Sequence, residues 1–114
     1  MPWIKLDTGF YTHPKTAELL AQPRGAEAVI ALQRIWCWAG ESDSPQARNG
    51  HISDALLRVL GITDKQARQL ADVGYLHRNG TGWHIHGWDE HQGALIERRA
   101  KDRDRKRKER SGDQ

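Results

Sequence analysis

The chain has 114 residues, of which 37% are hydrophobic and 29% are charged, and its formal net charge is +3. This length predicts a single domain, and no apolar run reaches the about 20 residues that a transmembrane helix needs. The N-terminus lacks the basic-then-apolar order of a signal peptide. The single cysteine, Cys37, cannot form an internal disulfide, so the predicted location is the reducing cytoplasm.

Positive charge is concentrated near the C-terminus. Residues 97–110 hold nine lysines and arginines and four acids, a net +5, whereas residues 1–96 hold nine basic and ten acidic residues, a net −1. We therefore expect a folded domain over 1–96 and a basic tail over 97–114 that is either helical or disordered. Such a run fits nucleic-acid contact as well as it fits simple solvation.

The first elements are an extended segment and two helices. Trp3 and Leu6 are the expected anchors of the extended segment. Pro14 fits the first position of a helix, where its missing N–H costs nothing, and this helix should end near Pro23. Residues 25–40 should form the longest helix.

The helix over 25–40 is apolar on most of its sides, so it is either central in the domain or covered by a partner. Trp38 borders its narrow polar stripe and is the candidate for a protein interface. The alternative is that Trp36 and Trp38 both belong to one core. Residues 41–49 are polar, include a proline and show no periodicity, which predicts a loop.

The stretch 50–74 carries the signals of a strand followed by two short helices. Ser53 fits the N-cap of the first helix, and Gly61 fits its left-handed end. Thr63 followed by Gln66 has the spacing of a capping box for the second helix. The tight turn between them predicts a helix-turn-helix.

A hairpin follows, with β-prone runs over 75–78 and 83–86 joined by Asn79–Gly82. Asn-Gly favours a turn with positive φ, and the inward residues should be Leu76, Trp83 and Ile85. We also expect a capping box at Asp89 and a C-terminal helix that docks through residues 94–96. The predicted fold is mainly α with a small β-hairpin: a winged helix-turn-helix with an extended basic C-terminal helix.

The remaining polar residues do not indicate catalysis. His77, His84 and His86 could share one face of the hairpin, but structural zinc sites usually need four ligands and often cysteines. The serines lie in loops or caps without a paired histidine, and the glycines at 80–82 lack the context of a phosphate-binding loop. We therefore predict neither an enzyme, nor a metal site, nor a cofactor.

The predicted partner is double-stranded DNA. If the chain is a helix-turn-helix, basic and amide side chains on the second helix reach the bases, while the wing and the tail reach the backbone. An ordinary solvated surface is the alternative for each of these residues. The candidates are Lys65, Gln66, Arg68 and Gln69 on the second helix, Arg78 and Asn79 at the wing, and Arg98, Arg99, Lys101, Arg103, Arg105, Lys106, Arg107 and Lys108 in the tail.

One pattern extends over nearly the whole chain: Trp3-x-x-Leu6-Asp7-x-x-Phe10-x-x-His13-Pro14-Lys15, Gly50-x-Ile52, Leu57, Leu60-Gly61, Gly82-Trp83-x-Ile85-His86-x-Trp88 and the arginine-rich tail. In this pattern the chain resembles a family of actinobacterial phage and prophage proteins that are similar to the winged-helix N-terminal domains of phage replisome organisers and replication-initiation proteins. The resemblance implies DNA contact through the helix at 64–73, in replication initiation or gene regulation, and in some members self-association. The competing functions are a dimerising or protein-interaction adaptor and a phage inhibitor of a host factor.

Overall fold

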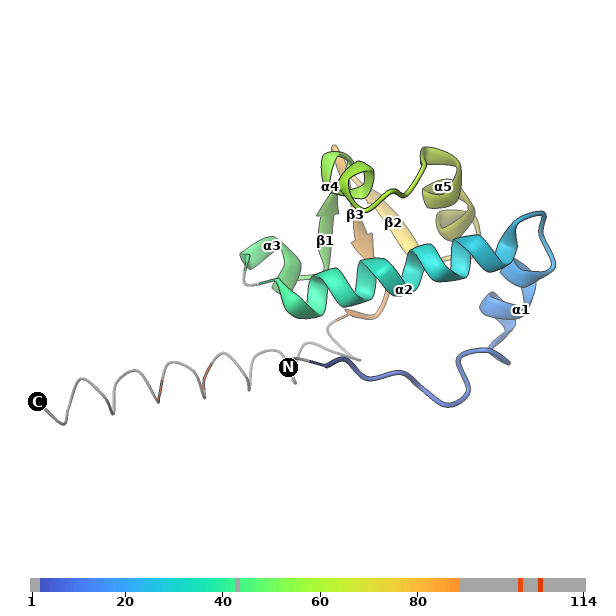
Figure 1. Cartoon of the computed structure of the whole chain (residues 1–114), viewed down its shortest axis with the longest axis horizontal. Helices are drawn as coiled ribbons and strands as arrows, with labels where there is room; N and C mark the ends of the chain where they lie inside the picture. The colour runs from blue at the N-terminus through green and yellow to red at the C-terminus, as the bar shows by residue number, and fades with distance from the viewer. Residues whose placement is uncertain (1–2, 43, 89–100, 102–104, 106–114) are drawn as a thin grey trace, which may run out of the picture.

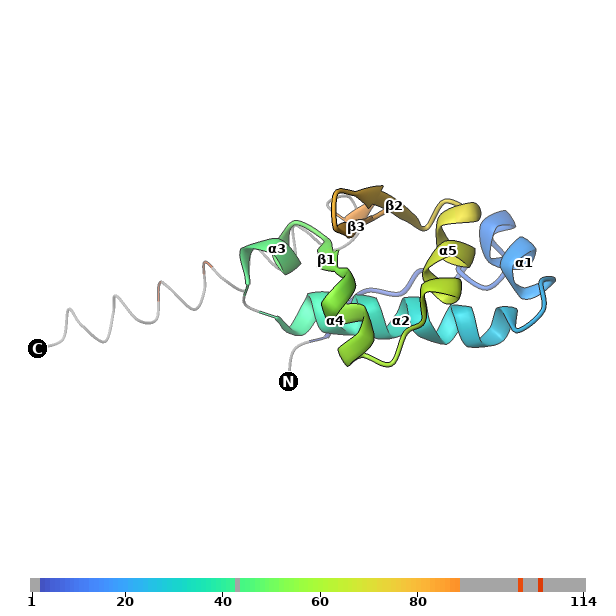
Figure 2. The same ribbon diagram turned by 90° about the horizontal axis from the view of Figure 1, so that it is seen from above.

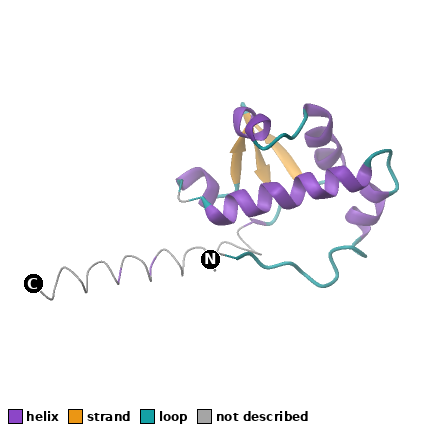
Figure 3. Cartoon of the chain, viewed as in Figure 1, coloured by secondary structure: helices purple, strands orange, loops and turns teal. Residues whose placement is uncertain are grey.

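The computed structural model describes residues 3–42, 44–88, 101 and 105. Within them, five helices and three strands form a mixed domain with a small antiparallel sheet (Figure 3). In chain order the elements are α1 (Pro14–Leu20), α2 (Gly25–Glu41), α3 (Pro45–Arg48), β1 (His51–Ser53), α4 (Asp54–Val59), α5 (Asp64–Asp72), β2 (Leu76–Asn79) and β3 (Gly82–Ile85).

Helix α2 is the central element. The sheet, α4 and α5 lie on one side of it, and the N-terminal segment runs along the other (Figure 1). Its residues Ala28, Leu32 and Ile35 are fully buried, and it contacts α1, α3, α5 and β1. Of the two outcomes expected for a helix this apolar, a central position or cover by a partner, the structure shows the central position, although Ile30 stays 50% exposed.

The three strands are arranged in the order β1-β3-β2, and both pairings are antiparallel. Ile52 and Trp83 are register partners, as are Leu76 and Ile85, and all four side chains are buried. The predicted inward residues of the hairpin are therefore confirmed. Its turn has two residues between the paired Asn79 and Gly82. Gly80 supplies the positive φ at 63°, which fits a type II′ turn.

The predicted helix starts in the middle of the chain are confirmed by their hydrogen bonds. The Ser53 hydroxyl accepts from the Leu56 N–H at 3.2 Å. Thr63 and Gln66 form the reciprocal capping box, with distances of 3.2 and 3.0 Å. Gly61 takes the left-handed conformation at φ 77°. Figure 2 shows α4 and α5 following one another above α2.

The prediction of a loop over 41–49 is wrong, because residues 45–48 form α3. The Ser44 hydroxyl accepts from the Ala47 N–H at 3.2 Å, and Pro45 occupies the first turn. Ala47 is fully buried and ties this turn to the body. A single helical turn is too short to show periodicity, so the Ser-Pro capping pattern was its only local signal.

The anchors of the N-terminal segment also differ from the prediction. Trp3 and Leu6 are 59% and 48% exposed, whereas Ile4 packs against the core and Phe10 is buried. The Phe10 and Trp36 rings pack edge to face, with their centroids 5.1 Å apart. The segment is irregular, so the size of an apolar side chain did not indicate which way it points.

Trp88, which follows the hairpin, packs into the folded domain. Its side chain is 2% exposed, and its indole N–H donates to the Arg48 carbonyl at 3.2 Å. It packs on Gly50, which has φ 75° and no room for a Cβ. The predicted capping box at Asp89 and the docking contacts at 94–96 lie outside the described residues.

Candidate nucleic-acid interface

The outer face of α5 presents two basic side chains. Ala67 and Leu70 are 1% and 0% exposed and turn the opposite face of the helix into the core, which leaves Lys65 and Arg68 exposed. Within the part of the chain that the structure describes, neither of them forms an ion pair. Both charges are therefore available to a polyanion.

The two glutamines of α5 are engaged inside the protein. The Gln66 side chain accepts from the Thr63 N–H at 3.0 Å as part of the capping box. The Gln69 amide donates to the Pro23 carbonyl at 3.1 Å and approaches the Gln22 side chain at 3.4 Å. Both were predicted to face DNA; in the structure Gln66 Oε1 and Gln69 Nε2 already take part in hydrogen bonds of the fold, which restricts how either amide can turn toward a base.

Arg78, on β2 beside the hairpin turn, is held by α4. Its guanidinium donates to both Asp54 oxygens, at 2.8 and 2.9 Å, and lies 4.8 Å from the Trp83 ring centroid. The Trp83 indole N–H also donates to Asp54, at 3.0 Å. These three residues, the Asp54–Arg78–Trp83 cluster, fix β2 and β3 to the first turn of α4.

The cluster has an electrostatic signature. The paired hydrogen bond from Arg78 is the largest cause that lowers the pKa of Asp54; desolvation opposes it, and the indole N–H of Trp83 and the charge of Arg58 lower it further. The same hydrogen bond raises the pKa of Arg78, and the charge of Asp64 at the start of α5 contributes to this rise. Arg78 is therefore ion-paired with Asp54, which reduces the charge it offers to a phosphate.

The other predicted contacts lie at the wing tip and in the tail. Asn79 is exposed at the tip. Lys101 and Arg105 are helical and exposed. The tail residues Arg98, Arg99, Arg103, Lys106, Arg107 and Lys108 lie outside the described residues.

Sequence reasoning missed three exposed arginines near α4 and α5. Arg58 lies in the last turn of α4. Arg34 on α2 approaches the Leu60 carbonyl at 3.5 Å, at the turn between the two helices. Arg24 lies in the connection between α1 and α2, to which Gln69 is bonded. Arg24 and Arg34 are far from α5 in sequence, which hid their proximity, whereas Arg58 lies on α4 itself.

Trp38, the predicted protein-interface residue, is half-buried and packs against the hydrophobic core. Other apolar side chains are more open: Ile30 on α2 is 50% exposed and Val59 at the end of α4 is 79% exposed. Contact with a partner through Trp38 remains a prediction. Its accessible area is limited because the body already covers part of the ring.

Histidines gather on the outer face of the sheet. His51, His84 and His77 are register partners across the three strands, and His77 Nε2 lies 2.8 Å from His86 Nδ1. Among the described residues, however, no group of three or more histidines, cysteines or acids has the geometry to hold a metal ion.

A cleft of about 960 Å³ lies beside the N-terminal segment. Phe10, Trp36, Tyr75 and Trp88 contribute aromatic walls, and Lys15 stands at the edge, 5.7 Å from the Tyr75 ring centroid. None of the lining residues in the described chain comes from α4 or α5. The cleft is thus separate from the basic surface.

No family model, curated protein or solved structure matches this chain. In the described residues, no helix is both long and apolar enough to cross a membrane.

Proposed function

We propose that this chain is a winged-helix DNA-binding protein of phage type that acts in replication initiation or gene regulation. Helix α5 enters a major groove, the β2–β3 wing lies near the backbone, and the basic tail meets phosphates. The observation that carries the proposal is the pair Lys65 and Arg68: both are exposed on α5, and neither is ion-paired within the described chain.

The element order supports the proposal. Strand β1, helices α4 and α5 and the β2–β3 hairpin follow one another, and β1 joins the hairpin in one sheet, an arrangement typical of a winged helix. Capping fixes α5 at its N-terminus, and burial of Leu70 fixes its rotation. A side chain on a fixed helix loses less conformational freedom on binding than one on a loop.

Arg68 is the residue we expect to read a base. A guanidinium can bond guanine O6 and N7 together, which is worth about 1–3 kcal/mol of discrimination against another base. Arg68→Ala should therefore relax the sequence preference and leave the urea midpoint unchanged, because the side chain is exposed.

The test is selection of bound duplexes from a random pool, repeated with Arg68→Ala and with Arg48→Ala as the matched control. Arg48 is an exposed arginine on α3. If the Arg68 variant selects the same sequence as strongly as the wild type, α5 is not the reading helix.

A protein-interaction module is the second candidate. It is favoured by the exposed Ile30 and Val59, by the half-buried Trp38 and by the slight negative charge of residues 1–96. A homodimer or a replication or host protein would be the partner. Duplex binding at varied salt, measured beside the mass in solution, separates the two functions: a salt-insensitive oligomer without duplex affinity favours the second.

A further inference from the structure

Arg24 has an unusual backbone conformation. Its φ of 57° and ψ of 26° are left-handed, and it is the one residue other than glycine with positive φ in the described chain. Such a conformation is unfavourable for a residue with a Cβ. Glycine or asparagine would be the ordinary choice at this position, so the arginine side chain needs a separate reason.

The connection around Arg24 has little freedom to relax. The Gly25 N–H donates to the Gln22 carbonyl at 3.0 Å, and a Cβ on Gly25 would lie 1.9 Å from the Leu19 carbonyl oxygen. The Gln69 amide then bonds the Pro23 carbonyl at 3.1 Å. The left-handed turn is thus built into the fold, whichever residue occupies position 24.

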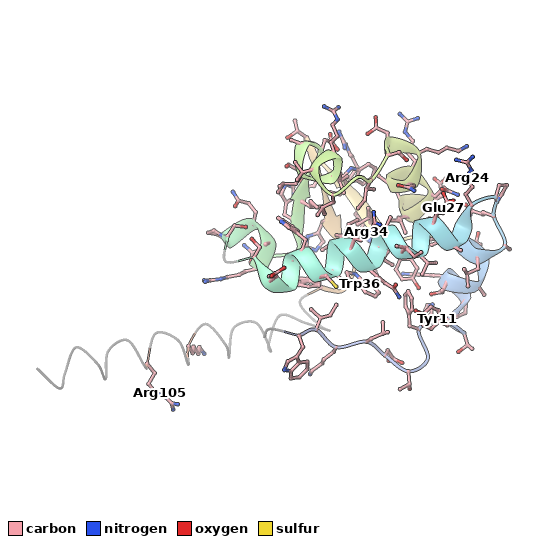
Figure 4. All side chains as sticks on the ribbon, in the orientation of Figure 1. Tyr11, Arg24, Glu27, Arg34, Trp36 and Arg105 are labelled. Atoms are coloured by element: carbon pink, nitrogen blue, oxygen red, sulfur yellow. The ribbon has the colours of Figure 1, made fainter. Side chains whose placement is uncertain are left out.

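The Gln69 bond places this turn beside the basic face of α5. Gln69 follows Arg68 directly and is one helical turn beyond Lys65, so the connection it binds borders the surface that these two residues form. The Arg24 side chain is exposed, and Figure 4 shows it on the side of the turn that faces α5. Glu27 is the nearest acid on α2 by sequence, one turn away, and no ion pair joins it to Arg24.

We propose that Arg24 binds a backbone phosphate of the duplex whose groove α5 occupies. This inference rests on the proposed DNA binding and extends it: the interface includes the α1–α2 connection, and Gln69 positions that connection instead of reading a base. A phosphate contact carries no sequence information, so Arg24 should set affinity and register for every duplex alike.

The test uses Arg24→Gly in the full chain, with Arg48→Ala as the control. Glycine suits a left-handed conformation, so the variant should melt at the wild-type temperature or above it. Loss of one phosphate contact should flatten the slope of log affinity against log salt by about 0.9. Arg24→Lys should keep the slope, because lysine also binds phosphate as a point charge.

Each outcome has one meaning. Arg24→Gly that is at least as stable as the wild type but has the flatter slope supports the inference. An unchanged slope for Arg24→Gly, in a wild type that does bind duplex DNA, overturns the role of Arg24 and leaves the proposed function standing. A wild type without salt-dependent duplex binding overturns the proposed function itself. If Arg24→Gly melts at a lower temperature than the wild type, Arg24→Asn replaces it, because asparagine also tolerates the left-handed region. A flatter salt slope for Arg24→Asn then supports the inference, and an unchanged slope overturns it.

Discussion

The docking of the N-terminal segment on α2 makes Gly40→Ala an informative substitution. A Cβ at this position would lie 2.3 Å from Cγ2 of Ile4 and 3.8 Å from its Cβ. The first contact is far too short and the second is ordinary. Gly40 therefore allows Ile4 to lie directly on the helix, near the helix C-terminus.

Two opposing terms determine the stability of Gly40→Ala. Replacing a helical glycine by alanine stabilises a helix by about 0.5–1 kcal/mol. Forcing an extra carbon into a filled contact costs about 1–3 kcal/mol. The net change therefore ranges from about zero to a loss of about 2.5 kcal/mol. This loss cannot exceed the free energy that holds the segment on α2, because the segment can undock.

The same substitution should have the opposite sign without Ile4. In an Ile4→Ala background, Cγ2 is absent and only the ordinary 3.8 Å contact remains. Gly40→Ala should then stabilise the protein by about 0.5–1 kcal/mol. Urea unfolding of the four variants, followed by far-UV circular dichroism, measures the coupling directly. Equal effects of Gly40→Ala in the two backgrounds would refute the docking of Ile4 on Gly40.

Two further predictions concern charge. The pKa of Asp54 is lowered in the folded state, so the bonds of its carboxylate stabilise the fold. This stability is fully present above about pH 4, the ordinary pKa of an aspartate. It is lost as the pH falls through the lower pKa of the folded state. The urea midpoints of wild type and Asp54→Asn should therefore differ at about pH 6 and converge on acidification; a constant difference would contradict the assignment. Deletion of residues 101–114 should weaken binding to all duplexes nearly equally and flatten the salt slope by about 4–5 units, if about five phosphates are neutralised at about 0.9 each. The urea midpoint should not change, and an unchanged slope would mean that the tail is either a solvated appendage or a contact for a protein partner.

Local signals predicted the elements that follow from local chemistry. Ser53 and Thr63 cap α4 and α5 as expected, because a cap depends only on residues within one turn. Strand alternation likewise placed Trp83 and Ile85 inward. The four-residue α3 was missed because one turn shows no period, although Ser44 and its following proline form the same kind of cap.

Contacts between distant residues could not be predicted in this way. The N-terminal segment has no regular period, so nothing local distinguished Ile4, which is partly buried against the core, from the exposed Trp3. Which of the two side chains packs on the body depends on Gly40, 36 positions further along the chain. Because Gly40 has no Cβ, it leaves room on α2 for the branched side chain of Ile4.

The same limit applies to the candidate interface and shapes what its residues can do. By composition, Gln66, Gln69 and Arg78 are as suitable for DNA as Lys65 and Arg68. The structure separates them by existing bonds: each of the first three satisfies a group elsewhere in the fold. A side chain that must break such a bond to reach a base loses part of the energy it gains there. Under the proposed DNA binding, specific reading should therefore concentrate on Arg68 and Lys65, while the bonded residues hold α5, the β2–β3 hairpin and the α1–α2 connection in place.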